Sequence, residues 1–159
     1  MNKITPEHIK SVVKGGNWII RTDNDGVSYD GFKWNPVGEW TEAPDWNEEP
    51  ICRNGLFGQD KDCYGFCKRG SRFVFCETEG EHIPVDGEKV KVRKARILLI
   101  NKIPKELKFN GSLFLWGCIL PDGFPIGDVG GSLDLIDCIL PDGTPVDEEM
   151  FRGLFLNGT

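Results

Sequence analysis

The residue types that most often carry chemistry are scarce in this sequence, which contains six cysteines and two histidines. Zinc sites usually take cysteines in C-x2-C pairs, whereas the nearest pair here is Cys63-x3-Cys67. A structural zinc site is one alternative, and its ligands would be Cys52, Cys63, Cys67 and Cys76. Because Cys76 ends the apolar run Phe73–Cys76, we expect a small core residue there and no bound metal.

Catalytic motifs are also missing. The sequence has no G-x-S-x-G, P-loop or H-E-x-x-H pattern, which would indicate a nucleophile, a phosphate site or a zinc peptidase. His8 falls in the first turn of an expected helix and His82 at the start of an expected strand, so we expect neither to be catalytic. The sequence therefore predicts a protein that is not an enzyme and needs no cofactor.

One pattern keeps an enzymatic alternative open. Glu77-Thr-Glu79 has the Glu-x-Glu form and is similar to the motif of some ADP-ribosyltransferases. That resemblance implies a carboxylate beside the ribose of a bound nicotinamide nucleotide, with an arginine and a serine on neighbouring strands. Arg21 and Ser28 are the residues that would take these two roles.

A tryptophan-rich acidic segment favours binding over catalysis. Trp34, Trp40 and Trp46 recur at intervals of six residues, and tryptophan is a large amphipathic side chain that is frequent in protein interfaces. Acidic residues surround them, so the candidate binding residues of this segment are Trp40, Glu42, Asp45 and Trp46. The alternative is a tryptophan core for a small β domain, which applies to Trp34 and Trp40 more than to Trp46.

Local patterns place these residues in an N-terminal β-rich domain at residues 1–95. A helix is expected over residues 5–14, because Thr5 can cap it and Pro6 suits its first turn. Short alternating runs predict strands at Trp18–Arg21, Val27–Tyr29, Gly31–Trp34, Arg72–Glu77, His82–Val85 and Lys89–Val92. No helix-length segment separates the strands, so we expect antiparallel pairing, with a long loop at residues 35–69.

The last third of the chain contains an internal repeat. Residues 111–130 read GSLFLWGCILPDGFPIGDVG and residues 131–150 read GSLDLIDCILPDGTPVDEEM, with eleven of the first fifteen positions identical. Alternating leucines on a short strand can share one core when successive coils stack on each other. The sequence predicts leucine-rich-repeat-like coils of period 20 at residues 96–159. Leu113 would lie above Leu133 in parallel strands, and Arg96–Ile103 would form an imperfect first coil.

In such coils, the side chains between the inward leucines face outward. The candidate binding residues at these positions are Phe114, Trp116, Asp134, Ile136 and Phe155. A strip this apolar is seldom left bare on a monomer, so the N-terminal domain, a second copy or a partner protein would cover it. The last strand, near Leu154–Leu156, would form an open sheet edge and is a candidate homodimer contact.

Two resemblances bear on the origin of the chain. The repeat resembles the leucine-rich-repeat-like arrays of phage and prophage proteins, which implies a parallel β-solenoid and a binding role. The order GFKW, GEW, PICRNGLFG, YGFC and RFVFCETEG, at about residues 30–100, resembles a small domain of unknown function in phage and bacterial proteins. That domain carries Cys-x-x-Gly-[LF]-His, and Phe57 stands here in place of the histidine.

The charge of the chain disfavours one class of partner, nucleic acid. Nineteen Lys and Arg oppose 25 Asp and Glu, a net charge of −6, which argues against direct binding to nucleic acid. The basic run Lys89–Arg96 has Lys89, Lys91 and Arg93 at alternating positions, as on one solvated strand face. The sequence has no apolar run of about 18 residues and no signal-peptide pattern, so we expect a cytoplasmic protein without a membrane span.

Together these patterns predict an α+β, mainly β protein. An antiparallel N-terminal domain with one short helix is followed by a short parallel β-solenoid. The expected function is non-catalytic protein binding of phage or mobile-element type. An inhibitor of a host defence factor, such as a CRISPR nuclease complex, would fit the acidic charge, and its partner would be a protein complex of the host cell.

Overall fold

The computed structural model describes residues 4–27, 31–63, 66–67, 72–104, 107–115, 117–120, 128–129, 133–134, 137–140 and 142–146. The elements found there are α1 (Pro6–Gly15), β1 (Trp18–Asp23), β2 (Trp40–Glu42), β3 (Leu56–Gly58), β4 (Phe66–Cys67), β5 (Arg72–Glu79), β6 (Ile83–Val85), β7 (Lys89–Val92), β8 (Lys94–Ile100), β9 (Lys108–Phe109), β10 (Leu113–Leu115), β11 (Asp128–Val129) and β12 (Leu133–Asp134). The described chain is therefore mainly β with one short helix, as the sequence predicts. No helix in this part of the chain has the length and apolar character that a membrane crossing requires.

Helix α1 begins at its predicted capping residue, Thr5, and ends at Gly16. Thr5 is the N-cap, and its hydroxyl oxygen accepts a hydrogen bond of 3.1 Å from the backbone N–H of His8. Gly16 ends the helix with φ 76°, a left-handed conformation that glycine adopts without a Cβ clash. Val12 is buried and Val13 packs against the same core, so the apolar stripe of the helix faces inward.

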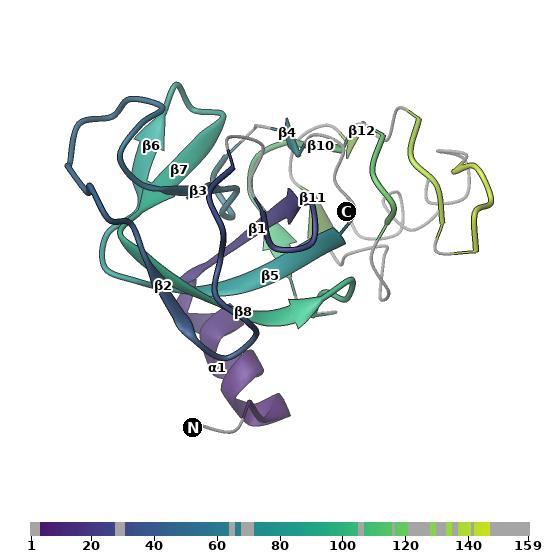
Figure 1. Ribbon diagram of the computed structural model, residues 1–159. Helices are drawn as coiled ribbons and strands as arrows, with labels where there is room; N and C mark the ends of the chain where they lie inside the picture. The colour runs from purple at the N-terminus through teal and green to yellow at the C-terminus, as the bar shows by residue number, and fades with distance from the viewer. Residues whose placement is uncertain are drawn as a thin grey trace.

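The helix lies against a four-stranded sheet with the strand order β1-β5-β8-β2 (Figure 1). β5 pairs antiparallel with both of its neighbours, for example through Ile19 and Cys76, which confirms the antiparallel expectation. β8 belongs to this sheet, since Arg96 pairs with Glu77. The expected first coil at Arg96–Ile103 is therefore wrong, because its apolar run Ile97–Ile100 belongs to an antiparallel strand instead.

Alternation along β1 and β5 divides the interior into two apolar clusters. The helix-side core consists of Val12, Trp18, Ile20, Phe73, Phe75, Leu98, Ile103, Leu107, Phe109, Leu115, Cys118, Leu120 and Cys138. The loop-side core consists of Ile19, Trp34, Ala43, Leu56, Cys63, Val74, Cys76, Val90, Val92, Ala95 and Ile97. The helix-side core takes residues from the N-terminal sheet and from the repeat, so the repeat packs directly onto the sheet.

The loop-side core is completed by a second sheet with the strand order β3-β7-β6. β6 and β7 form an antiparallel hairpin in which Val85 pairs with Lys89, and Asp86 (φ 55°) and Gly87 (φ 73°) lie in the three-residue connection between them. β3 pairs with the other edge of β7, where Phe57 lies opposite Lys91. The expected long loop at residues 35–69 is thus partly regular, because it contains β2, β3 and β4.

The expected strands at residues 27–29 and 31–34 are reduced to isolated bridges in the described chain. Val27 pairs with Asn24 and with Lys33, and residues 28–30 lie outside the described part. The turn that precedes them is fixed by an ion pair, in which Nε of Arg72 donates a hydrogen bond of 2.6 Å to Oδ1 of the buried Asp23.

The repeated segment pairs with itself at a constant offset. The parallel partners in β10 and β12, in β9 and β11 and at one isolated bridge are Leu113 and Leu133, Lys108 and Asp128, and Ile119 and Ile139. Each pair is separated by twenty residues, which is the period of the sequence repeat. Between residues 108 and 139, the described strand pairs therefore follow the sequence period, while the β-solenoid as a whole stays a prediction.

An earlier segment of the chain lies against this stack. β4 pairs in parallel with β10, and the backbone N–H of Asn110 donates a hydrogen bond of 2.7 Å to the carbonyl oxygen of Lys61. A Cβ atom on Gly111 would lie 2.5 Å from the carbonyl oxygen of Cys63. Only glycine allows this approach, so the glycine that opens the repeat is explained by its contact with the N-terminal segment.

The repeated cysteines are structural. Cys118 and Cys138 are both buried in the helix-side core. The thiol of Cys138 donates a hydrogen bond of 2.8 Å to the carbonyl oxygen of Leu115. A small side chain at this position thus connects the second repeat of the sequence to the backbone of the first.

Leu115→Ala tests the packing of the repeat on the sheet. Leu115 is fully buried in the helix-side core, so truncation leaves a cavity and should lower the free energy of unfolding by about 3 kcal/mol. The measurement is urea denaturation followed by tryptophan fluorescence. Ile119→Ala is the control, since Ile119 is 39% exposed, and it should cost less than about 1 kcal/mol. Equal losses would contradict this placement of Leu115.

Candidate functional site

A fully buried lysine organises the segment that carries the candidate binding residues. Lys91 in β7 has a relative exposure of 0%. Its Nζ donates hydrogen bonds of 2.8 Å to the carbonyl oxygens of Glu49 and Arg53, and one of 3.3 Å to Oδ1 of Asn47. The ring centroid of Trp46 lies 5.2 Å from the same nitrogen. An ammonium group has three N–H donors, and all three find acceptors in one loop.

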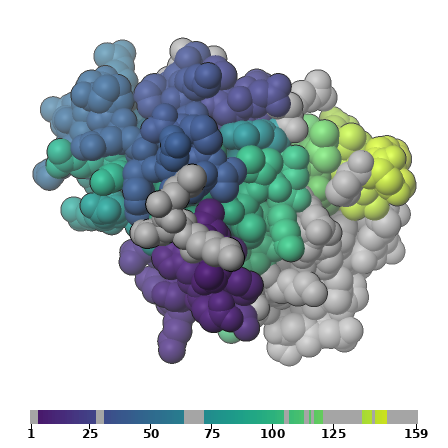
Figure 2. Space-filling view, turned by 60° about the horizontal axis from the view of Figure 1, so that its bottom comes forward, coloured from purple at the N-terminus to yellow at the C-terminus, as the bar shows by residue number. Residues whose placement is uncertain are grey.

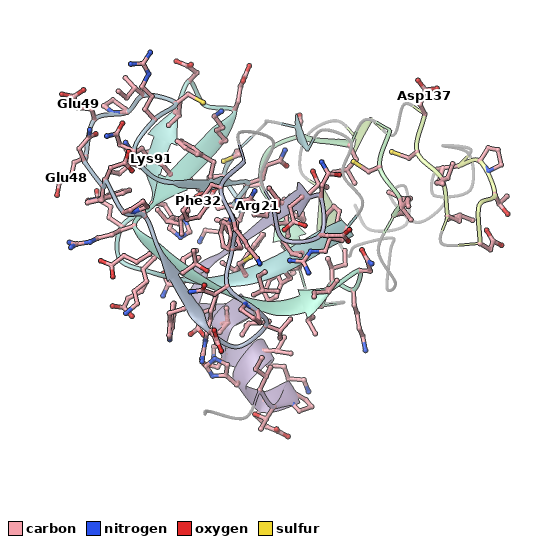
Figure 3. The ribbon with its side chains drawn as sticks, in the orientation of Figure 1. Arg21, Phe32, Glu48, Glu49, Lys91 and Asp137 are labelled. Carbon is pink, nitrogen blue, oxygen red and sulfur yellow. The ribbon has the colours of Figure 1, made fainter. Side chains whose placement is uncertain are left out.

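Residues 45–55 are termed the acidic loop. Its inward-facing oxygens surround Lys91, whereas the side chains of Asp45, Glu48 and Glu49 are exposed. Figure 3 shows Glu48 and Glu49 at the outer edge of the molecule and Lys91 nearer the interior. The carbonyl and amide oxygens of the loop therefore point toward the buried ammonium, and its carboxylates face the solvent.

The end of the acidic loop is held by its own hydrogen bonds. Nδ2 of Asn54 donates to the carbonyl oxygen of Asp45 at 3.0 Å, and the carbonyl oxygen of Asn54 accepts from the N–H of Asn47 at 3.3 Å. Space is tight beside them, because a Cβ atom on Gly55 would lie 3.1 Å from Cε of Lys91. The loop is thus closed around the lysine by contacts from both of its ends.

Trp40 lies in β2, the edge strand of the four-stranded sheet, just before the acidic loop. It is half-buried, and Arg96 and Lys94 of β8 place their charged groups 4.9 and 5.4 Å from its ring centroid. Cation–π contacts of this kind contribute about 0.5–2 kcal/mol each, so they hold the ring on the sheet. The exposed Glu42 contacts the exposed Arg93 at 3.4 Å, a pair of the kind that contributes little to stability.

Four of the predicted binding residues lie close together in the sequence and on one segment of the structure. Trp40, Glu42, Asp45 and Trp46 lie in β2 and the acidic loop, within the blue segment that covers one corner of the face in Figure 2. Of the other predicted binding residues, Trp116, Ile136 and Phe155 lie outside the described part, and only the backbone is described for Phe114 and Asp134. Trp34 is 3% exposed in the loop-side core, as the core alternative predicts.

The burial of Lys91 is not apparent from its place in the sequence. The alternating run Lys89–Arg96 predicts a solvated face, and this is wrong for Lys91, although Arg93 is exposed as expected. Val90 and Val92, on the other face of the same run, lie in the loop-side core. Nothing in the run itself indicates that another segment covers the opposite face.

Glu77 belongs to an ion cluster that connects helix α1 to the sheet. Its Oε1 accepts a hydrogen bond of 2.7 Å from Nε of Arg96 and lies 2.9 Å from Nε2 of His8. Nη2 of Arg96 lies 3.0 Å from the same ring nitrogen of His8. One ring nitrogen cannot donate and accept at once, so in each tautomer Nε2 of His8 hydrogen-bonds only one of the two partners.

The residues of the enzymatic alternative are not brought together. Arg21 pairs with Val74 across β1 and β5, and Val74 is an odd number of residues from Glu77. Arg21 and Glu77 therefore lie on opposite faces of the sheet. Glu79 is exposed, and Ser28 lies outside the described residues.

The proposed zinc ligands are also separated. Cys52 is exposed, whereas Cys63 and Cys76 are buried, and the thiol of Cys67 lies outside what the structure describes. No cluster of three or more candidate ligands that could hold a metal ion occurs among the described residues. Cys76 is fully buried in the loop-side core, as its apolar surroundings in the sequence predict.

His82 joins two segments through a row of hydrogen bonds. Its Nδ1 lies 2.8 Å from Oδ2 of Asp60, and its Nε2 lies 2.6 Å from Oγ1 of Thr78. Oδ1 of Asp60 accepts from the N–H of Asp62 at 2.9 Å and from the thiol of Cys63 at 3.3 Å. Burial alone would raise the pKa of Asp60, but these hydrogen bonds outweigh it and hold the pKa below the ordinary 3.8.

The same row has the order carboxylate, imidazole, hydroxyl, which activates the nucleophile of many acyl-transfer enzymes. Thr78, however, is 5% exposed, and its backbone N–H donates to the carbonyl oxygen of Asn17 at 2.9 Å. It therefore offers neither an accessible nucleophile nor a free oxyanion donor. The row acts as a connection between the residues after β3 and the turn between β5 and β6.

Asp60→Asn should destabilise the protein at neutral pH but not in acid. The carboxylate of Asp60 has a lower pKa in the folded chain than in the unfolded chain. Its contribution is therefore complete above the unfolded pKa and is lost as the pH falls through the folded pKa. We expect a loss of about 2 kcal/mol at pH 7, measured by urea unfolding at several pH values. Glu81→Gln, at an exposed position, is the control, and a loss that is the same at every pH would contradict the assignment.

Lys91→Met should open the acidic loop. It leaves the acceptors on Glu49, Arg53 and Asn47 without their donor, and we expect a loss of about 3 kcal/mol in the free energy of unfolding. Trypsin should then cleave after Arg53 faster than in the unchanged protein. Lys89→Met on the same strand is the control and should cost less than about 1 kcal/mol. Unchanged cleavage and stability would show that Lys91 does not hold the loop.

The two resemblances suggested by the motifs concern about residues 30–100 and 96–159. Comparison of the chain with protein-family models, with curated proteins and with solved structures found no match. The phage or prophage context therefore stays a prediction.

Proposed function

We propose that this chain is a non-catalytic protein-binding protein whose acidic loop and adjoining strand β2 dock on a positively charged protein surface. Asp45, Glu48 and Glu49 supply negative charge at exposed positions. Apolar area comes from Ile51, which is 40% exposed, and from the half-buried Trp46. An aromatic anchor within a polar rim is a common composition for protein interfaces.

The cage around Lys91 is the observation that carries this proposal. A flexible loop loses conformational entropy when it binds, and this loss reduces affinity. The acidic loop is already fixed by three hydrogen bonds to one buried ammonium and by the contact of Trp46 with the same group. Its carboxylates are therefore in place before a partner arrives.

The charge points to the chemistry of the partner. The chain carries a net charge of −6, which attracts a basic surface over long range and raises the association rate at low salt. A groove that normally binds nucleic acid has such a surface. We therefore propose a host defence nuclease, such as a CRISPR nuclease complex, as the first candidate partner. The acidic loop would compete with the phosphate backbone of the nucleic acid for this groove.

The repeat would supply a second binding surface. Its strand pairs between residues 108 and 139 have the twenty-residue offset of stacked coils, which supports a β-solenoid that continues toward the C-terminus. The outward strip of this solenoid would comprise Phe114, Trp116, Asp134, Ile136 and Phe155. The partner or a second copy of the chain at the last strand would cover it, and the protein would act in the cytoplasm of a host cell.

The charge-reversed double variant Glu48→Lys/Glu49→Lys tests the proposal. The tagged full chain is used to isolate partners from a bacterial lysate, which mass spectrometry identifies. It is also added to guide-dependent DNA cleavage by a purified CRISPR nuclease complex. We expect the unchanged protein to slow cleavage, with an effect that weakens as salt rises. The double variant should bind at least about tenfold more weakly, because both carboxylates become repulsive.

The matched control is Glu7→Lys/Glu81→Lys, which reverses two exposed charges outside the acidic loop. It should bind and inhibit like the unchanged protein. Binding that both double variants weaken equally would mean that only net charge matters. A chain that retains no lysate protein and leaves nuclease activity unchanged would contradict the proposed function.

A further inference from the structure

An exposed cysteine and a lysine amine meet at the rim of the acidic loop. Cys52 lies in this loop and its thiol is exposed. Lys89, at the start of β7, places Nζ 2.8 Å from Sγ of Cys52. A thiol and a primary amine at this distance are two nucleophiles in direct contact.

Both partners of this contact are held in position. Lys91, two residues further along β7, bonds the carbonyl oxygens of Glu49 and Arg53, which flank Cys52 in the sequence. Nζ of Lys89 also lies 5.0 Å from the ring centroid of Phe57 in the neighbouring strand β3. The buried ammonium thus fixes the loop on the same strand that carries the reactive amine.

The other thiols that the structure describes are withdrawn from solvent. Cys63, Cys76, Cys118 and Cys138 are buried. Burial raises the pKa of Cys63 and of Cys76 to about 12, so both stay protonated and unreactive at neutral pH. An oxidant in solution therefore reaches Cys52 before these four.

We propose that Cys52 and Lys89 form an oxidation-dependent covalent bridge in which one oxygen atom joins Sγ to Nζ. The oxidant is dioxygen. The thiol loses its hydrogen atom, and the neutral amine loses one of its two hydrogen atoms. One oxygen atom of dioxygen then bonds to both sulfur and nitrogen. The second oxygen atom leaves as water with the two hydrogens, so four electrons pass from sulfur and nitrogen to dioxygen.

The bridge is reversible. Two molecules of dithiothreitol supply four electrons and four hydrogens, which restore the thiol and the amine and release water, and each dithiothreitol closes to a cyclic disulfide. Bridging ties the acidic loop to β7 covalently, beside the place where Lys91 holds it by hydrogen bonds. The modification depends only on this contact and is independent of the proposed binding function.

Intact mass spectrometry of the full chain is the test. The protein is reduced, freed of reductant and kept in air-equilibrated buffer, with an anaerobic sample in parallel. We expect the aerobic sample to gain about 14 Da, one oxygen atom less two hydrogens. The gain should be lost with dithiothreitol, and fragmentation should join a peptide with Cys52 to one with Lys89. Trypsin should no longer cleave after Lys89 in the bridged form.

Two variants serve as controls. Lys89→Arg keeps the positive charge beside Cys52 but removes the primary amine, and Cys52→Ser removes the sulfur, so neither should gain this mass. A gain of about 16 Da without a link would indicate a sulfenic acid, and a loss of about 2 Da would indicate a disulfide or a direct sulfur–nitrogen bond. Either result, an unchanged mass, or a gain that survives in Lys89→Arg would overturn the bridge.

Discussion

The ammonium of Lys91 has to be solvated by the protein, because β7 carries it into a position that water does not reach. Removing a charge from water costs several kcal/mol unless polar groups replace the solvent. The replacement comes from oxygens of Glu49, Arg53 and Asn47 and from the face of Trp46. Since all of them belong to one short stretch, solvating one charge also determines the shape of a whole loop.

The central sheet connects the core beside the acidic loop to the core beside the repeat. Neighbouring residues of β1 and β5 alternate between the two cores, so Ile19 packs toward the second sheet and Ile20 toward helix α1 and the repeat. The two cores are therefore separated by a single layer of backbone, and a strand that shifts because of a change in one core also moves side chains in the other. The row of Asp60, His82 and Thr78 reinforces this layer where the strands leave it. The acidic loop and the repeat are thus two surfaces of one framework.

Local signals predict the features that neighbouring residues determine. Thr5 closes the start of the helix, short alternating runs indicate the two strands of the hairpin, and the spacing of tryptophans marks the segment of the candidate site. The burial of Lys91 could not be predicted, because alternation tells which residues share a face and not what covers that face. The same limit explains the error at Arg96–Ile103, where a run of apolar residues fits a coil and an antiparallel strand equally well.

The constant offset in the repeat restricts how the length of the chain can vary. An insertion inside β9 or β10 would shift the later residues of that strand out of step with its parallel partner. In the predicted solenoid, adding or removing one complete unit would move the end of the stack by one strand spacing, about 4.8 Å, and keep the pairs intact. Changes of length in this predicted solenoid would therefore come in whole repeats, while the sheet and its buried charge remain untouched.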